Sequence, residues 1–187
     1  MGRERMVPEA RLEQTEYGLA PATEGWFVVN VRDGAWMTNE ALGDAFVVEG
    51  DAVELPQLGF TIGVFPPGQA SRYHREGNQE DFLVLQGRCI ALIEGEERPL
   101  KQWDFVHCPA GTDHAFVGAG DGPCVVFMVG SRQGWPETGI VYPRTEVALK
   151  HGAGVEQETS SPSEAYAAFP KWKAGPPASF RGLPWEA

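Results

Sequence analysis

Residues 68–87 constrain the fold of this chain more than any other part of its sequence. His74 and Glu76 are two residues apart, so on a β-strand both side chains would leave the same face. The trio Gly77-Asn78-Gln79 suits a tight turn, and Glu80 then opens a run of residues with strong β propensity. The pattern predicts a β-hairpin whose two strands aim one imidazole and two carboxylates at a common point.

A second stretch, Pro109-Ala110-Gly111-Thr112-Asp113-His114, has the composition of a turn that delivers another histidine onto a new strand. Imidazole and carboxylate groups that converge inside an apolar barrel are costly to bury unless something cationic pairs with them. A divalent metal ion is therefore the predicted occupant of the cluster, which consists of His74, Glu76, Glu80 and His114.

The first stretch resembles the first cupin motif. That motif is a Gly, five residues, His-x-His, three or four residues, Glu, six residues and a Gly. This chain has Gly68, five residues, His74-x-Glu76, three residues, Glu80, six residues and Gly87. All spacings agree, and Glu76 stands where the family usually has its second histidine.

The second stretch resembles the second cupin motif, in which Pro-x-Gly is followed after two residues by His. Pro109, Gly111 and His114 occupy these positions, whereas Trp103 and Gly118 replace the Gly and Asn that flank the motif. The resemblance covers about residues 59–131 and identifies the chain as similar to small cupins of a single-domain kind.

The resemblance implies an all-β fold, a double-stranded β-helix barrel of jelly-roll type. Residues 58–131 would form the barrel core and residues 1–57 an N-terminal arm with added strands. Residues 132–187 would form a C-terminal extension of short helices and an extended tail that packs on the barrel. The resemblance also implies a homodimer formed by contact between sheets and exchange of arms.

Local patterns predict further elements. The tail carries four prolines and two tryptophans, Trp172 and Trp185, which suggests that it packs on the barrel or on a neighbouring subunit. Strands are expected over residues 26–31, 58–66, 89–93, 114–117 and 124–129, an apolar patch over residues 42–50, and helices over residues 145–151 and 162–169.

Charge and cysteine content narrow the function classes. The net charge of −11 argues against nucleic acid and anionic membranes as partners. Residues 1–8 are charged and lack the apolar segment of a secretory signal. The three cysteines, Cys89, Cys108 and Cys124, are expected to be buried free thiols in a reducing compartment. The cytoplasm is the predicted location.

His74, Glu80 and His114 provide the two imidazoles and one carboxylate of a facial triad with open positions. Glu76 has three possible roles: a fourth ligand, a partner that orients a ligand histidine, or a general base with a raised pKa. These ligand types do not distinguish Fe, Mn, Ni, Zn and Cu. The sequence does not identify a catalytic residue.

Strand alternation also predicts the cavity. Residues in phase with Glu80 and His114 should point into the barrel, and His107 is expected to face either the cavity or the outside. Arg72 and Arg75, out of phase with His74, are expected to point outward. The predicted pocket-lining set, which suits a small organic ligand, is Phe65, Phe82, Val84, His107 and Phe116.

Three functions remain open at this stage. The favoured one is a metal-dependent enzyme of dioxygenase, isomerase or decarboxylase type that acts on a small organic molecule. The second is a non-catalytic module that binds a small ligand for sensing or storage, and the third is a purely structural barrel. The fold alone does not choose among them.

Overall fold

The computed structural model describes residues 7–49, 53–134 and 139–186. Within these ranges there are two short helices, α1 (Glu146–Lys150) and α2 (Pro162–Ala165), and the remaining regular structure is β. The strands are β1 (Leu12–Gln14), β2 (Leu19–Pro21), β3 (Ala35–Asn39), β4 (Gly43–Val47), β5 (Leu58–Phe65), β6 (Arg75–Glu76), β7 (Glu80–Gln86), β8 (Arg88–Ile93), β9 (Glu96–Lys101), β10 (Phe105–Cys108), β11 (His114–Ala119), β12 (Cys124–Ser131), β13 (Ile140–Val141) and β14 (Lys173–Ala174).

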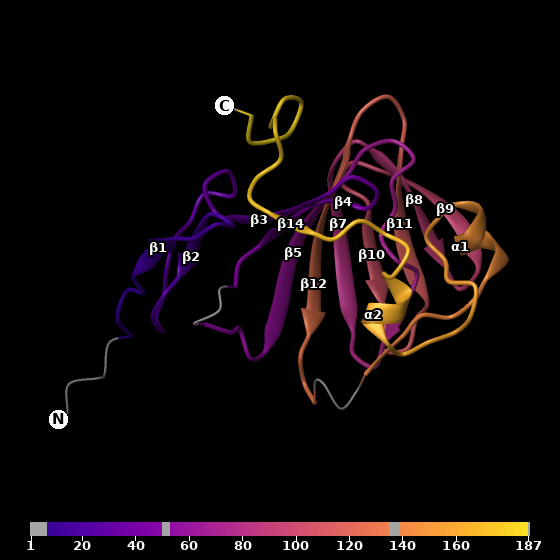
Figure 1. The fold of residues 1–187 in the computed structure, drawn as a ribbon, viewed down its shortest axis with the longest axis horizontal. Coiled ribbons are helices and arrows are strands. Elements are labelled where there is room, and N and C mark those ends of the chain that lie inside the picture. The colour runs from indigo at the N-terminus through magenta and orange to yellow at the C-terminus, as the bar shows by residue number, and fades with distance from the viewer. Residues whose placement is uncertain (1–6, 50–52, 135–138, 187) are drawn as a thin grey trace.

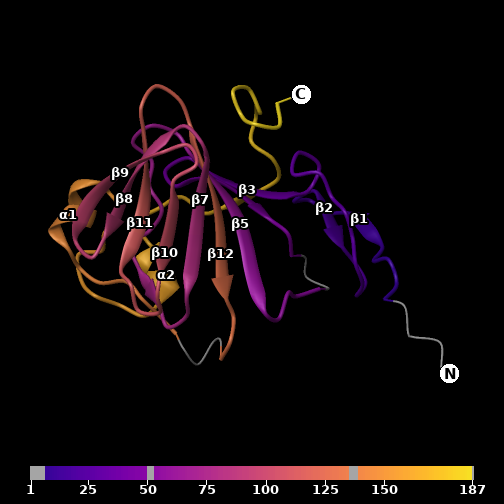
Figure 2. The ribbon, with the colours of Figure 1, turned by 180° about the vertical axis from the view of Figure 1, so that it is seen from behind.

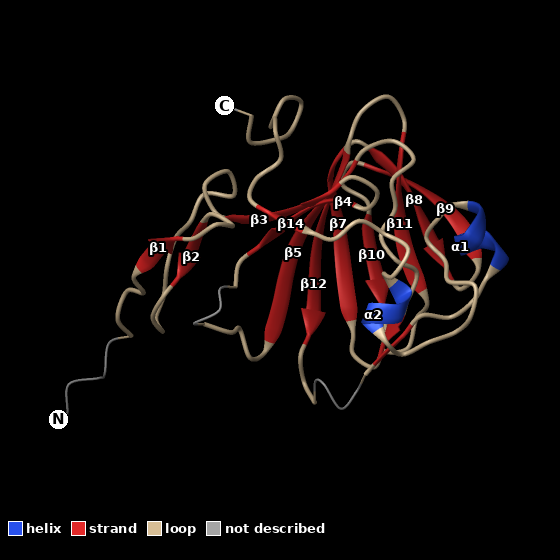
Figure 3. Ribbon diagram, viewed as in Figure 1, coloured by secondary structure: helices blue, strands red, loops and turns tan. Residues whose placement is uncertain are grey.

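Two sheets build the barrel. The larger has the order β10-β7-β12-β5-β4-β3-β14 and the smaller the order β11-β8-β9, while β1-β2 and β13-β6 form separate pairs. Figure 1 shows the long strands of the large sheet side by side, with the β1-β2 pair at one end of the molecule and β9 with α1 at the other. Figure 2 shows the same arrangement from behind, and Figure 3 shows how little of the chain is helical. The predicted all-β, double-stranded β-helix fold is confirmed.

The main core lies between the two sheets. Phe82 and Val84 of β7 and Phe116 of β11 are each 3% exposed or less, as the predicted alternation requires. Phe65 at the end of β5 joins the same cluster, and so do the three cysteines, which are buried free thiols as expected. Close packing of this kind supplies most of the burial that drives folding.

The tail covers part of the outer face of the large sheet. Trp36 on β3 is fully buried there, and its ring centroid lies 5.6 Å from that of Trp185. Leu183 is buried in the same cluster. The indole N–H of Trp36 donates to the carbonyl of Val31 at 2.8 Å, so this polar group has a hydrogen-bond partner inside the apolar cluster.

Several predicted elements match and two do not. Thr145 precedes α1 and Gly152 follows it with φ of 68°, as the helix-end pattern predicts. The helix expected over residues 162–169 begins as predicted, with the Ser161 hydroxyl accepting from the Glu164 N–H, but it ends at Ala165. Turn-type hydrogen bonds then replace the helical ones.

The strand expected over residues 26–31 is wrong. Trp26 makes one bridge, to Glu9, and Val28 is 80% exposed. The Asn30 carbonyl instead accepts from two N–H groups of a turn, and the true strand, β3, begins after that turn. An apolar run forms a strand only where a neighbour is free to pair with it, and local pattern does not reveal the neighbour.

The predicted hairpin around residues 77–79 is also wrong. β6 pairs with β13, whereas β7 lies between β10 and β12. The chain therefore turns a corner of the barrel at this point instead of folding back on itself. Residues 1–6, which belong to the N-terminus predicted to lack a signal, lie outside the described ranges. Within those ranges, no helix has the length and apolar character needed to cross a membrane.

Candidate metal centre

Main-chain hydrogen bonds hold His74 and His114 side by side. The His74 N–H donates to the His114 carbonyl at 3.0 Å, and the His114 N–H donates to the His74 carbonyl at 2.8 Å. This reciprocal antiparallel bridge puts the two side chains on the same face. Their ring centroids are 4.7 Å apart, which satisfies the requirement that both rings reach one ion.

A backbone carbonyl fixes the tautomer of each ring. His74 Nδ1 lies 2.8 Å from the carbonyl oxygen of Arg72, and His114 Nδ1 lies 3.0 Å from that of Thr112. Because a carbonyl only accepts, each Nδ1 carries the proton and each Nε2 keeps its lone pair. Histidines that bind metals are oriented by partners of this type.

Glu80, the first residue of β7, completes the group. Its Oε2 lies 3.4 Å from His114 Nε2. One potential ligand atom from each of His74, Glu80 and His114 lies within 4.8 Å of the others. This is close to the span of two metal–ligand bonds of about 2.0–2.2 Å each. The donor set, two neutral imidazoles and one carboxylate, suits a divalent transition metal.

Burial keeps these groups uncharged while no cation is beside them. It lowers the pKa of His114 to about 3, with a smaller contribution from His74, and it lowers the pKa of His74 as well. Burial also raises the pKa of Glu80 to about 8, and the neighbouring charge of Glu76 adds to this effect. A cation would reverse the penalty on the Glu80 carboxylate, so the electrostatics of the cluster favour a positive occupant.

Glu76 lies near the cluster but is not a member of the three-residue group. Burial raises its pKa, and the positive charge of Arg132 acts in the opposite direction. Its position as a fourth ligand therefore stays a prediction. The other two predicted roles, orienting a ligand and acting as a base, remain open to it.

A cavity of about 510 Å³ opens beside the cluster, and we call it the metal-side cavity. Four of the residues predicted to line the pocket belong to the main core and are not among the residues that line this cavity: Phe65, Phe82, Val84 and Phe116. Phe82 supports the site from below, because its ring centroid lies 5.0 Å from that of His114. The residues of the metal-side cavity that matter for the site are Thr61, His74, Glu76, Glu80, Met128 and Arg132.

His107 does not face the cavity. Its side chain is 51% exposed, and its Nδ1 donates to the Asp81 carboxylate at 2.6 Å. Val106 pairs across the sheet with the inward-facing Phe82, and this register turns His107 outward. The sequence left open whether His107 faces the cavity or the outside, and in the structure it faces the outside.

The expectation that Arg72 points outward is wrong, because Arg72 is buried. Its guanidinium donates to the carbonyls of Gly152 and Gly154, and it lies 4.6 Å from the ring centroid of Phe169. The C-terminal extension folds over this side chain. Arg75, in contrast, is partly exposed and pairs with Asp113 at 2.9 Å.

Sequence reasoning missed two residues near the cluster. The Tyr142 ring centroid lies 5.9 Å from that of His74, and burial raises the pKa of its phenol. Arg132, which lines the metal-side cavity together with Glu49, donates two hydrogen bonds to the Glu49 carboxylate. Both residues follow the two motifs in the chain. The signal that places Tyr142 is the β6-β13 pairing, which no local pattern predicts.

Comparison with known proteins agrees with this architecture. Residues 61–130 match a family model described as a cupin domain. A 5-nitrosalicylic acid 1,2-dioxygenase from Bradyrhizobium sp is 27% identical over 82 residues, a match that covers 41% of this chain and 40% of that protein. The chain thus matches well under half the length of this curated relative.

Solved structures similar to this chain include the following two. KdgF from Halomonas sp. is 24% identical, with a TM-score of 0.49 over 58% of this chain and 96% of that one. A sugar phosphate isomerase from Silicibacter pomeroyi is 30% identical, with a TM-score of 0.42 over 48% of this chain and 59% of that one.

Proposed function

Because this chain belongs to the cupin superfamily, we propose that it binds a divalent metal ion through His74, Glu80 and His114. We further propose that it is a metal-dependent enzyme, of dioxygenase or isomerase type, acting on a small organic molecule. The dioxygenase relative supports an oxidative reaction class. A bound divalent ion would supply Lewis acidity or a site for dioxygen at the floor of the cavity.

One observation carries the proposal. Both imidazoles are held by main-chain carbonyls in the tautomer that leaves Nε2 unprotonated, and a carboxylate lies within reach of the same point. Two such nitrogens beside Glu80 suit a ligand set.

The surrounding residues suit a substrate pocket. The metal-side cavity has room for a small organic molecule, and its walls combine apolar Met128 with charged Glu76 and Arg132. Glu76 lines the same cavity, and burial raises its pKa, so we propose this carboxylate as the candidate general base. The buried Tyr142 ring lies beside His74, with 5.9 Å between the ring centroids.

Metal analysis of protein purified without chelator tests the first part of the proposal. We expect about one equivalent of a divalent metal in the wild type and strong loss of metal in His114→Ala and Glu80→Gln. His107→Ala is the matched control, because this histidine is exposed and paired on the outer face. Equal metal content in His114→Ala and His107→Ala would contradict the proposed ligand set.

Dioxygen uptake by the iron-loaded protein, screened against small aromatic acids and other small organic acids, tests the second part. Uptake that depends on both the compound and Glu80 supports an oxygenase. Stoichiometric metal without turnover in this screen or in isomerase assays would favour the non-catalytic ligand-binding module instead.

We also propose a homodimer in a reducing compartment, the cytoplasm. The free cysteines support the location. Phe105 and Trp103, at the β10 edge of the large sheet, are 64% and 66% exposed, and such aromatic side chains favour an interface. Light scattering at micromolar concentration should give the mass of two chains, and Phe105→Glu should give one. A wild-type monomer would contradict the dimer.

The domain organisation is proposed on the same basis. Residues 58–131 would form the barrel core, with residues 1–57 as an arm and residues 132–187 as an extension. The main core cluster, drawn entirely from the central segment, supports this division.

A further inference from the structure

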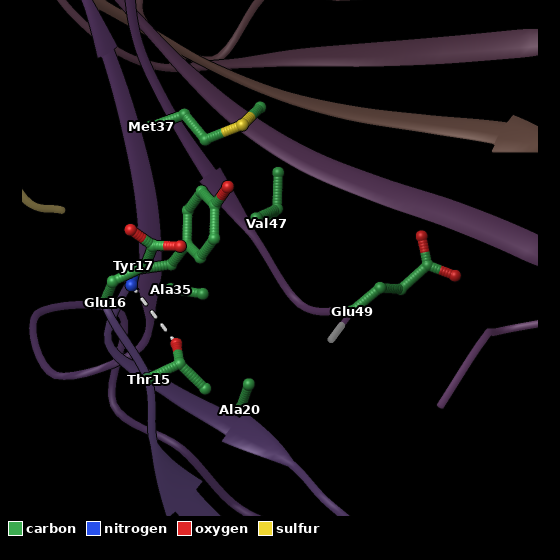
Figure 4. Close-up of a pocket in the computed structure, with 8 residues that line it drawn as sticks. All are labelled: Thr15, Glu16, Tyr17, Ala20, Ala35, Met37, Val47 and Glu49. Atoms are coloured by element: carbon green, nitrogen blue, oxygen red, sulfur yellow. Dashed lines mark hydrogen bonds between the residues drawn. The ribbon is translucent and has the colours of Figure 1, made fainter. Parts of the chain in front are cut away.

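A second cavity, also of about 510 Å³, lies between the N-terminal arm and β3-β4. We call it the arm cavity, and its walls include Tyr17, Ala20, Ala35, Met37, Val47 and Glu49. Figure 4 shows the Tyr17 ring pointing toward Met37 and Val47, while the Glu49 carboxylate is turned away from that ring. Val47 and Glu49 also line the metal-side cavity. The two cavities therefore adjoin each other along β4.

Sheet register puts both cavities on one face of the large sheet. Val47 on β4 pairs with Thr61 on β5 and with Ala35 on β3. Thr61 in turn pairs with Met128 on β12, which pairs with the inward-facing Phe82 on β7. Directly opposed residues share a sheet face, so the inner face of the barrel continues into the arm cavity.

Two glycines lie on the inner face of the sheet between the two cavities. In the row that starts at Glu80, the next two positions across the sheet are Gly130 on β12 and Gly59 on β5. Neither residue has a side chain to fill the space above the sheet. The row spans three strand spacings from β7 to β4, about 14 Å. A molecule that reached from the cluster to β4 would have to pass the Arg132 guanidinium, which lies over Gly59.

Arg132 and Glu49 form a polar constriction between the two cavities. The Arg132 guanidinium lies over Gly59, where an added Cβ would come within 2.9 Å of its Nε. It is held there by its two hydrogen bonds to Glu49 and one to the carbonyl of Leu55. Eight residues line the arm cavity beyond this constriction: four are apolar, Tyr17 is aromatic with a hydroxyl group, and the other three, Thr15, Glu16 and Glu49, are polar or charged.

We propose that the arm cavity is a second substrate subsite, which takes an apolar chain or ring attached to the molecule held at the cluster. This inference rests on the proposed function and specifies its substrate class: an elongated molecule with a polar, metal-binding head and an apolar tail. Continuity along one sheet face and the two wall residues that the cavities share, Val47 and Glu49, favour one ligand over two separate ones.

A series of hydroxamates on the cobalt-loaded protein tests this subsite, with the visible spectrum of cobalt reporting binding at the metal. Acetohydroxamate should bind through its head alone. Octanohydroxamate and dodecanohydroxamate should bind progressively more tightly, by up to about fourfold for each methylene that enters the arm cavity. In Met37→Trp, which fills the cavity, the gain from chain length should disappear while the Kd of acetohydroxamate stays within twofold.

Tyr17→Ala, which removes the wall of the cavity, is a second variant that should also reduce the gain. Val28→Trp is the control, because that side chain is 80% exposed on another segment. A gain from chain length that persists in Met37→Trp and Tyr17→Ala would overturn the subsite. A gain that appears only with chain association in light scattering would also overturn it, by assigning the tail to a contact between two copies.

A measurement without metal separates the two proposals. The uncharged probe N-phenyl-1-naphthylamine should fluoresce on the metal-free protein and lose that signal in Met37→Trp. If acetohydroxamate fails to bind the cobalt-loaded protein but this probe behaves as expected, the metal centre is wrong and the apolar subsite stands. If the probe signal is unchanged in Met37→Trp, the subsite is wrong whatever the metal centre does.

Discussion

The pH dependence of metal affinity should report a single proton, the one on Glu80. The pKa of this carboxyl is raised to about 8 by burial and by Glu76, so a metal ion must displace a proton from it at neutral pH. The two histidines do not compete in this range, because burial lowers the pKa of both. Below pH 8, metal affinity should therefore fall tenfold for each pH unit.

The size of the effect follows from the ionised fraction of Glu80. With a pKa of about 8, this fraction is about three quarters at pH 8.5 and about 3% at pH 6.5, so the apparent Kd for the metal should weaken about 25-fold. A carboxyl with the ordinary pKa of 4.5 would be ionised at both pH values. In that case, the affinity would hardly change.

Competition titration against a fluorescent chelator, with the chelator's own pH dependence measured separately, gives the apparent Kd. Calorimetry in buffers of different ionisation enthalpy should show about one proton released per metal at pH 6.5 and only a fraction of one at pH 8.5. A Kd that is flat across this range would refute the view that burial holds Glu80 protonated. Glu80→Gln should bind metal weakly and without this pH dependence.

Two further variants test neighbouring residues. Glu76→Gln should lower metal content without abolishing it, and should shift the pH dependence downward because the charge of Glu76 helps to raise the pKa of Glu80; metal content equal to the wild type would exclude Glu76 as a ligand. Arg72→Met should destabilise the fold by about 1–3 kcal/mol, measured by urea unfolding, because the half-buried carbonyl of Gly154 loses a charged donor. The exposed Arg98→Met, which loses a surface pair with Glu96, is its control at about 0–1 kcal/mol, and equal losses in both variants would contradict the role given to Arg72.

The sequence predicted the cluster better than the path of the chain around it. The spacing of His74, Glu80 and His114 was sufficient because each residue opens or precedes a strand of the barrel, and strand alternation then sets its direction. The predicted hairpin failed because a short turn and a barrel corner use the same Gly and Asn residues. Only the partners of β6 and β7 distinguish the two, and those partners are distant in the chain.

Residues contributed by distant segments were beyond local reasoning. Arg72 was expected to face solvent as if out of phase with His74, but the two residues are two positions apart, so regular strand alternation puts both on one face. The C-terminal extension then folds over Arg72 and supplies two carbonyls. Tyr142 reaches the cluster for the same reason. Strand alternation predicts on which face of a strand a side chain lies, whereas the burial of that face depends on which other segments of the chain cover it.

The reciprocal bridge between His74 and His114 has a consequence for how an ion is captured. Because main-chain hydrogen bonds position both rings, the entropy cost of ordering them arises when the barrel folds and not when an ion binds. Stripping the ion with a chelator should leave the sheet intact, in contrast to small domains that collapse without zinc. Such a barrel can exchange one ion for another while folded, and its occupant in a cell would follow the supply of metals as well as the preference of the site.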